Sequence, residues 1–290
     1  MRSGFVALVG RPNAGKSTLL NCVVGSKVSI VSDKPQTTRL RVRGIVHGPD
    51  SQIVFVDTPG IHKAVTHLGE RLNQTARAVV SDLDDLDVAC LVVNAAAPVG
   101  PGDRRIWDAL PERSVVVVTQ CDRVRRHRIA EQLDAVSDFG ADAYFAVSGR
   151  TGDGVDDVLE YLRGRCPEGP AWFPPGQTTD LPETWRVAEV VREQLLRHCR
   201  EELPYSIATR ITTWKPKHIL CEILVERDSQ RGIVIGHRGE VLKQVGIAAR
   251  AELGLDGVYL ELHVRVERDW QRRPAAVERV LDVVEPDGES

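Results

Sequence analysis

Residues 10–17 have the types and spacing of a phosphate-binding loop. They read GRPNAGKS and match the pattern G-x-x-x-x-G-K-S/T, with strand, loop and helix in the order that such a site requires. Glycines let backbone N–H groups turn inward around a phosphate, Lys16 supplies positive charge to the β and γ oxygens, and the Ser17 hydroxyl can bind Mg²⁺. A glycine-rich turn without a ligand is the alternative. The expected phosphate-binding residues are Gly10, Arg11, Pro12, Asn13, Ala14, Gly15, Lys16, Ser17 and Thr18.

A carboxylate that can serve the same phosphates follows a later apolar run. The segment QIVFVDTPG ends in Asp57, Thr58, Pro59 and Gly60. Asp57 can hold Mg²⁺ through a water, and the Gly60 N–H can contact a γ-phosphate. The pattern D-x-x-G is weak alone, because any acidic turn can give it, and becomes specific downstream of a phosphate loop. We therefore expect all four residues to line a nucleotide site.

Between these two motifs, the segment KPQTTR offers two hydroxyls, Thr37 and Thr38. Either threonine can simply cap a loop. We favour Thr38 as a switch residue whose hydroxyl completes the Mg²⁺ shell, beside Ser17 and Asp57, only when a γ-phosphate is present.

A loop that could read guanine follows the β-branched run in residues 115–124, VVVVTQCDRV. The expected pattern is Asn-Lys-x-Asp, and this sequence has Thr119, Gln120, Cys121 and Asp122. The Asp122 carboxylate can accept hydrogen bonds from guanine N1–H and the 2-amino group, whereas adenine would leave it unpaired. Thr119 can brace the loop. Because glutamine has a shorter stem than lysine and no charge, we expect weaker nucleotide binding by about 1 kcal/mol.

Ser148 and Gly149 follow the last strand-like run and resemble the Ser-Ala turn whose backbone N–H meets guanine O6. Glycine keeps that N–H and is expected to loosen the turn. Two alternatives stay open: a Ser-Gly turn with no ligand, and a TQCD segment that merely ends a strand.

The elements that must position these residues alternate along residues 1–166. Strands are expected at FVALV, RVRGIVHG, QIVFVD, VACLVVN, SVVVVT and AYFAV, and helices at STLLNCVV, HLGERLNQTARAVV, RIAEQLDAVSDFG and DGVDDVLEYLRG. This rhythm is typical of an α/β fold, a mostly parallel sheet with helices on both faces, whose ligands bind at the carboxyl ends of the strands.

A Pro/Gly-rich interval at residues 167–182 indicates a linker to a smaller α+β domain at residues 183–290. In that domain we expect a helix from 185 to 200, strands at 206–213 and 219–226, a turn into a helix, a strand at 258–266 and a helix after Pro274. The turn contains Gly236, His237, Arg238 and Gly239, a G-x-x-G loop. Alone, this pattern is a common turn.

Together GRPNAGKST, KPQTTR, DTPGIH and GIVIGHRGEVLKQVG resemble the bacterial Era family, a GTPase domain followed by a KH domain, over nearly the whole chain. The resemblance implies GTP hydrolysis, binding of the 3′ end of 16S ribosomal RNA and assistance to assembly of the 30S subunit. In KH folds the G-x-x-G loop lies between two helices and clamps unpaired nucleotides. His237 departs from the family's lysine, so the basic character of the loop depends on Arg238.

The resemblance also implies the catalytic set Lys16, Thr38, Gly60 and Asn13. Asn13 resembles the asparagine that binds K⁺ beside the phosphates in related GTPases; the alternative is that it only tolerates a left-handed turn. Ile61 stands where many small GTPases carry a water-orienting glutamine, so slow intrinsic turnover is expected.

The composition sets limits on partners. Of 290 residues, 42% are hydrophobic and 27% charged, which is typical of globular domains. The net charge of −3 gives no global reason to bind a polyanion, and residues 171–290 carry 17 Lys+Arg against 20 Asp+Glu. Any RNA surface must therefore be local. The cations expected near the G-x-x-G loop are Arg231, Arg238, Lys243, Arg250, Lys215 and Lys217, with His237.

We expect a cytoplasmic monomer, because neither a signal peptide nor a membrane-spanning run is visible, and leave open peripheral association with the inner face of the cell membrane. The six scattered cysteines are expected to be reduced and mostly buried.

Mg²⁺ is the expected cofactor, and K⁺ a second candidate. Two rival hypotheses remain: an RNA-binding module whose nucleotide domain is degenerate and structural, and a P-loop ATPase or kinase.

Overall fold

The computed structural model describes residues 1–290 except 35–36, 61–63, 82–85, 199–205 and 283–290. The chain forms two compact units, one containing most of residues 1–180 and the other residues 181–290 together with Ser32–Pro35 and Ala64–Glu70.

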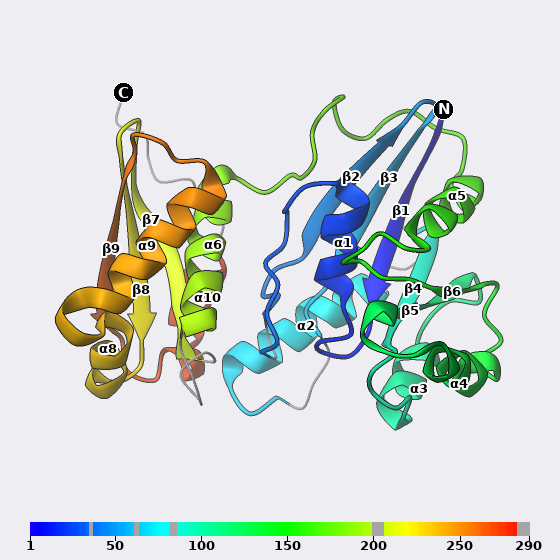
Figure 1. The fold of residues 1–290 in the computed structure, drawn as a ribbon, viewed down its shortest axis with the longest axis horizontal. Coiled ribbons are helices and arrows are strands. Elements are labelled where there is room, and N and C mark those ends of the chain that lie inside the picture. Colours follow the sequence, from blue (N-terminus) through cyan, green and yellow to red (C-terminus); the bar gives the residue numbers. More distant parts are fainter. Residues whose placement is uncertain (35–36, 61–63, 82–85, 199–205, 283–290) are drawn as a thin grey trace. The chain divides into compact units, whose positions relative to one another are not determined.

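The first unit has the expected six strands in one sheet, in the order β2-β3-β1-β4-β5-β6 (Figure 1). All neighbours are parallel except β2 and β3. The strands are β1 (Arg2–Val9), β2 (Val42–Gly48), β3 (Ser51–Asp57), β4 (Val88–Asn94), β5 (Ser114–Thr119) and β6 (Tyr144–Ala146).

Helices cover both faces of this sheet, as the alternation of apolar runs predicts. Helices α1 and α5 pack on one face, and α3 and α4 contribute Ile106 and Val136 to the apolar core of the other. The helices are α1 (Lys16–Val24), α2 (His67–Ser81), α3 (Pro101–Trp107), α4 (Arg126–Ser137) and α5 (Val155–Arg165), and a 3-10 turn, η2 (Cys121–Arg123), follows β5. The sequence patterns did not predict α3, which is short and begins with Pro-Gly.

The Pro/Gly-rich interval after α5 is hydrogen-bonded to the first unit. The Gln52 side chain, fully buried in β3, accepts from the N–H groups of Trp172 and Phe173 at 2.7 and 3.0 Å and donates to the Phe173 carbonyl at 2.8 Å. Farther along, Ile45 N–H donates to the Thr178 carbonyl at 2.9 Å. This interval therefore follows the edge of the sheet, and the domain boundaries at 166 and 183 stay predictions.

The second unit is a three-stranded sheet in the order β7-β8-β9, antiparallel and then parallel. Its core is built from apolar residues of α6, α8, α9 and the sheet. The elements are α6 (Glu183–His198), β7 (Ala208–Lys215), β8 (His218–Val225), α8 (Asp228–Ile235), η3 (His237–Gly239), α9 (Glu240–Leu253), β9 (Tyr259–Val266), η4 (Trp270–Arg272) and α10 (Pro274–Leu281). The pattern-based order missed α8, whose β-branched end GIVI does not read as helix.

Cys90, Cys166 and Cys221 are buried free thiols, whereas Cys22 and Cys121 are partly exposed. Burial raises the pKa of Cys90 to about 12 and that of Cys166 to about 11, so these thiols stay protonated and act as apolar packing groups. In the part of the chain that the structure describes, no helix is long and apolar enough to cross a membrane.

Candidate functional site

The loop between β1 and α1 is shaped by close backbone approaches. A Cβ at Gly10 would lie 2.4 Å from the Val92 carbonyl oxygen, and one at Gly60 would lie 2.9 Å from the Pro12 backbone. Gly15 has a φ of 96°, in the left-handed region that favours glycine. Lys16 opens α1 and is buried, and its Nζ donates to the carbonyls of Gly10 and Arg11 at 3.2 and 3.1 Å. The ammonium therefore lies inside the curl of the loop.

The predicted metal-binding side chains meet at one carboxylate oxygen. Ser17 Oγ donates to Asp57 Oδ2 at 2.7 Å, and Thr38 Oγ1 lies 3.0 Å from Ser17 Oγ and 3.4 Å from Asp57 Oδ2. These residues come from α1, the end of β3 and the loop before β2, and the threonine favoured from the sequence, Thr38, is part of this cluster. Ser29 Oγ adds a further hydroxyl, 3.4 Å from the same Oδ2.

The electrostatics of this cluster fit a divalent cation. Asp57 is fully buried and its Oδ1 has no hydrogen-bond partner among the described residues. Desolvation raises the pKa of Asp57, against the opposing effects of Lys16 and the three hydroxyls, and desolvation likewise lowers the pKa of Lys16. A carboxylate oxygen with neighbouring hydroxyls is the donor set that Mg²⁺ prefers, completed by water and phosphate. Ser17, Thr38 and Asp57 would hold that ion.

Sequence reasoning missed two residues that organise this cluster, Ser29 and Asn21. The Asn21 Oδ1 accepts from the N–H groups of Val28 and Ser29 at 3.0 and 2.9 Å, and its Nδ2 donates to the Ser29 carbonyl at 2.7 Å. An asparagine in a helix and a serine in an irregular segment match no motif, so only the tertiary structure reveals them.

The loop after β5 is tied to the phosphate loop by two side chains. Thr119 Oγ1 donates to the Ala14 carbonyl and lies 3.1 Å from the Val93 carbonyl, and Gln120 Nε2 donates to the Asn13 carbonyl at 2.9 Å. Asn13 itself has a φ of 60°, the left-handed turn conformation considered from the sequence. Thr119 therefore braces the loop, and Gln120 reaches the phosphate loop despite its short stem.

The two candidate base-reading segments also meet. Ser148 Oγ donates to Asp122 Oδ1 at 2.8 Å and accepts from the N–H groups of Arg150 and Thr151 at 3.3 and 3.1 Å. Asp122 is exposed, so a base can reach its carboxylate. A Cβ at Gly149 would lie 3.0 Å from the Leu19 N and Cα atoms of α1. The turn is thus closely packed on α1, which differs from the loose turn that glycine alone suggested.

In the second unit, the G-x-x-G residues form the turn η3 between α8 and α9. Gly236 and Gly239 have φ values of 74° and 81°, and Arg238 has 50°. A Cβ at Gly236 would lie 2.9 Å from the backbone N of Val241, so no other residue fits there without a shift. His237 and Arg238 are exposed. The loop therefore presents backbone and two side chains to solvent, as a nucleic-acid clamp requires.

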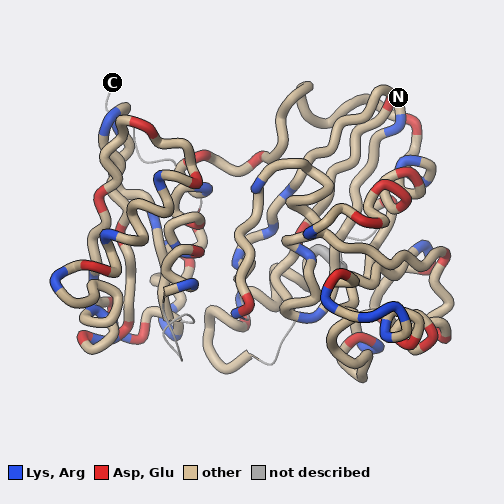
Figure 2. Tube along the Cα trace, viewed as in Figure 1, with Lys and Arg blue, Asp and Glu red and all other residues tan. Residues whose placement is uncertain are grey.

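The exposed cations expected near this loop divide into two groups. Arg231 lies on α8 and Lys243 and Arg250 on α9, the helices that flank the loop. Lys215 and Lys217 instead lie in the β7–β8 hairpin, at the start of β8. Helix α8, which leads to the G-x-x-G loop, begins after the opposite end of that strand. Figure 2 shows both signs of charge interspersed over the second unit. Ile61 lies outside the described residues.

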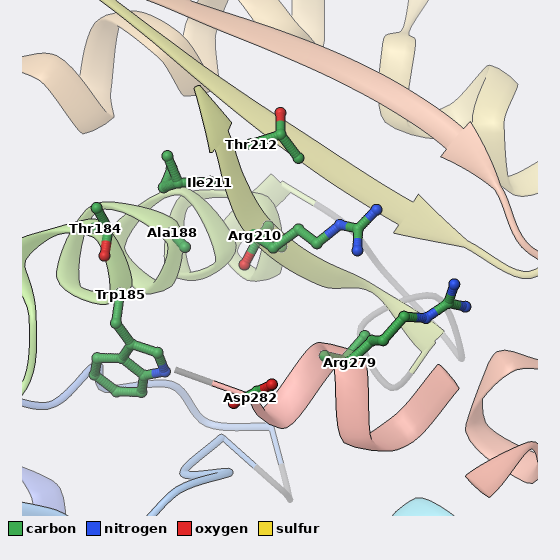
Figure 3. Close-up of a pocket in the computed structure, with 10 residues that line it drawn as sticks. Thr184, Trp185, Ala188, Arg210, Ile211, Thr212, Arg279 and Asp282 are labelled. Atoms are coloured by element: carbon green, nitrogen blue, oxygen red, sulfur yellow. The ribbon is translucent and has the colours of Figure 1, made fainter. Parts of the chain in front are cut away.

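The second unit also contains a pocket of about 380 Å³ between α6, β7 and α10 (Figure 3). Its two arginines are paired: Arg210 with Glu222 at 2.7 Å and Arg279 with Glu267 at 2.6 Å. None of the predicted site residues lines it. Its residues are Thr184, Trp185, Ala188, Thr209, Arg210, Ile211, Thr212, Arg279, Val280 and Asp282.

Fold and site define the class of protein: a P-loop GTPase domain joined to a KH domain. The family described as "50S ribosome-binding GTPase" matches residues 5–120, and the KH domain family matches residues 202–271. GTPase Era of Mycobacterium sp. (strain KMS) is 46% identical over 96% of this chain and 98% of its own length, and GTPase Era of Mycobacterium tuberculosis (strain ATCC 25177 / H37Ra) is 45% identical with the same coverage. The chain belongs to the Era family of GTPases.

Solved structures agree with this assignment. A single-residue variant of Aquifex aeolicus Era, bound to GDP and AlF4⁻, has a TM-score of 0.90 at 36% identity and covers 97% of this chain and 99% of its own. Era in complex with MgGDPNP and nucleotides 1506–1542 of 16S ribosomal RNA has a TM-score of 0.91 at 36% identity, covering 97% of this chain and 98% of its own. The expected fold class, GTPase activity and family are therefore confirmed.

Proposed function

We propose that this chain is a guanine-nucleotide switch that binds the 3′ end of 16S ribosomal RNA and assists assembly of the 30S subunit. The observation that supports this most is the meeting of Thr38, Ser17 and Asp57 at one buried carboxylate oxygen. Thr38 is the one of the three that comes from a loop between elements, so a γ-phosphate and Mg²⁺ would fix that loop and GDP would release it.

In GTP hydrolysis, Lys16 would move from the Gly10 and Arg11 carbonyls to the phosphate oxygens and stabilise charge that develops there. The Gly60 N–H would contact the γ-phosphate, and the Asp122 carboxylate would select guanine. Mg²⁺, when bound, supplies positive charge that the β- and γ-phosphates share. Two observations support these roles. The Lys16 ammonium is buried, and Asp57 Oδ1 has no hydrogen-bond partner among the described residues.

Asn13 is proposed to hold K⁺ beside the phosphates, a role that its exposed position at the loop surface allows. Hydrolysis measured in K⁺ and in Na⁺ at fixed ionic strength tests this proposal. Faster turnover in K⁺ supports it, whereas equal rates leave Asn13 with only its conformational role.

The RNA ligand is proposed from the loop between α8 and α9. A structural relative at 36% identity was solved with nucleotides 1506–1542 of 16S ribosomal RNA, and this chain has a G-x-x-G loop with exposed His237 and Arg238. Binding should weaken with salt, because phosphate contacts release counterions. The roles of Arg231, Lys243, Lys215 and Lys217, the monomeric state and membrane association stay predictions.

Phosphate release from GTP and from ATP, with and without an RNA that ends in a pyrimidine-rich tail, tests the whole proposal. We expect phosphate release from GTP only. We also expect RNA to change the rate of GTP hydrolysis, or GTP to change the affinity for RNA. RNA binding without any GTP turnover would instead support the alternative, an RNA-binding module whose nucleotide domain is structural.

A further inference from the structure

Gln120, the residue that departs most from the expected guanine loop, is hydrogen-bonded at both ends of its amide. Its Nε2 donates to the Asn13 carbonyl at 2.9 Å, and its Oε1 accepts from Nη1 of Arg123 at 2.7 Å. The sequence predicted a loss of binding here because glutamine brings no charge. The structure places a charge three residues later, on the far side of the same amide.

We propose that Arg123 and Gln120 together replace the missing lysine of the guanine loop, with Arg123 as a positioning residue for guanine nucleotide. In this arrangement Gln120 makes the bond to the phosphate loop, and Arg123 fixes the amide and supplies the positive charge. The inference depends on the proposed reading of guanine by Asp122.

The local backbone brings the two side chains together. Gln120 has a φ of 58°, and the 3-10 turn that follows it closes with a bond from Arg123 N–H to the Gln120 carbonyl at 3.0 Å. The turn therefore brings the backbones of the two residues together, within reach of the side-chain bond between Arg123 and Gln120.

The bond from Arg123 changes what the amide can do. A guanidinium that donates to Oε1 forms a charge-assisted hydrogen bond and polarises the amide, which makes Nε2 a stronger donor to Asn13. It also fixes the amide orientation, since a flipped Gln120 would present Nε2 to the guanidinium. Arg123 is exposed, and its positive charge follows directly on the exposed carboxylate of Asp122 in the chain.

The position of the bond explains its value for nucleotide binding. Thr119 and Gln120 donate to the carbonyls of Ala14 and Asn13, two successive residues of the phosphate loop. In a trans peptide the N–H points away from the C=O, so fixing these two carbonyls also fixes the directions of the Ala14 and Gly15 N–H groups in the loop. Gln120, held by Arg123, would therefore affect phosphate binding as well as the loop that reads the base.

A double-mutant cycle on the full-length protein tests the pairing through GDP affinity in the presence of Mg²⁺. We expect Gln120→Ala and Arg123→Ala each to weaken GDP binding about threefold to tenfold, and the double variant to be no weaker than the weaker single variant. Arg126→Ala is the matched control, an exposed arginine at the start of α4 with the same charge loss. It should change affinity by less than about twofold.

Restoring GDP affinity in the Arg123→Ala variant distinguishes a positioning role of Arg123 from a general effect on protein stability. Gln120→Lys introduced into the Arg123→Ala variant should restore wild-type affinity, because lysine carries both the donor and the charge. Additive losses in the cycle, no effect of Arg123→Ala, or failure of this rescue would each overturn the inference. If wild-type protein bound GDP no better than ADP, the proposed reading of guanine would fail instead, and with it the guanine preference on which this inference rests.

Discussion

The nucleotide loops and the G-x-x-G loop are held in opposite ways. The carbonyls of the phosphate loop are held by its own buried lysine and by Thr119 and Gln120 at the end of β5, close to a fully buried aspartate. The G-x-x-G loop depends on its own backbone conformation, with two glycines and Arg238 in the left-handed region and its middle side chains exposed.

This difference follows from the ligands. A small, highly charged nucleotide needs desolvated groups held before it arrives, because the preformed site then has little reorganisation to undergo on binding. A single RNA strand is bound along its backbone at a solvent-exposed surface, where close approach and surface charge matter more than burial. Removing one side chain should therefore be far more costly in the first region than in the second.

The largest expected effect is that of Lys16→Ala, which removes the charge inside the phosphate loop. We expect GTP hydrolysis to fall by at least about 10³-fold, because the ammonium is desolvated and directed at the charge that develops on the phosphates. Hydrolysis and GDP affinity are measured, with Lys217→Ala in the second unit as the matched control. An active Lys16→Ala variant would show that the loop does not act on phosphate.

The second largest effect is expected for Asp122→Asn, which should weaken GDP binding by about 10²-fold because a guanine donor would face an amide donor. The same variant should accept xanthine nucleotides, whose 2-oxo group matches the amide. Binding titrations with GDP and XDP measure the exchange. Unchanged GDP affinity would mean that the loop after β5 does not read the base.

In the exposed region, a charge reversal is needed for a comparable effect. We expect the double variant His237→Asp, Arg238→Asp to bind RNA at least about 30-fold more weakly at low salt, because two carboxylates replace the side chains that face phosphates. Its basal GTP hydrolysis should be unchanged. Arg126→Asp, His127→Asp at the exposed start of α4 is the matched control, because it replaces the same two residue types outside the predicted RNA surface, and an equal loss there would argue for a diffuse electrostatic effect. Loss of both activities would indicate misfolding.

The buried aspartate also predicts a pH dependence that the exposed loop lacks. Burial raises the pKa of Asp57, so as pH falls this carboxylate takes up a proton earlier than an ordinary one. MgGDP binding must then release that proton, and affinity should fall about threefold to tenfold from about pH 7.5 to about pH 5. Asp57→Asn should bind more weakly at pH 7.5 but lose this slope. Parallel profiles for the two proteins would exclude Asp57 as the titrating group.

The sequence predicts the motifs of both regions but only part of their support. Six apolar runs predict the strands of the first sheet, and motif spacing predicts Lys16, Thr38 and Asp57 at its carboxyl edge. The bonds of Thr119 and Gln120 to the phosphate loop join residues more than a hundred positions apart, and Ser29 and Asn21 belong to no motif. Such contacts are set by tertiary packing, so local patterns cannot contain them. The bond of Gln120 to the phosphate loop is such a contact, and the weaker nucleotide binding expected from its sequence stays a prediction.

The smallest expected effect separates the two regions most sharply, because two glycines are constrained for different physical reasons. Gly149 lies outside the left-handed region, but its Cβ would meet α1 backbone atoms at 3.0 Å. Gly239 has a φ of 81°, and among the described residues no atom lies within 4 Å of its Cβ position. We expect Gly149→Ala to weaken GDP binding by about 1 kcal/mol by pushing the Ser148 turn from α1, even though alanine is the residue the related turn carries. Gly239→Ala should cost about 1 kcal/mol of RNA affinity or of second-unit stability through backbone strain alone. Titrations with GDP and RNA and thermal melts of both variants give the comparison. If Gly149→Ala tightened GDP binding, the turn would have room to spare, and its close packing on α1 would not be what positions Ser148 against Asp122.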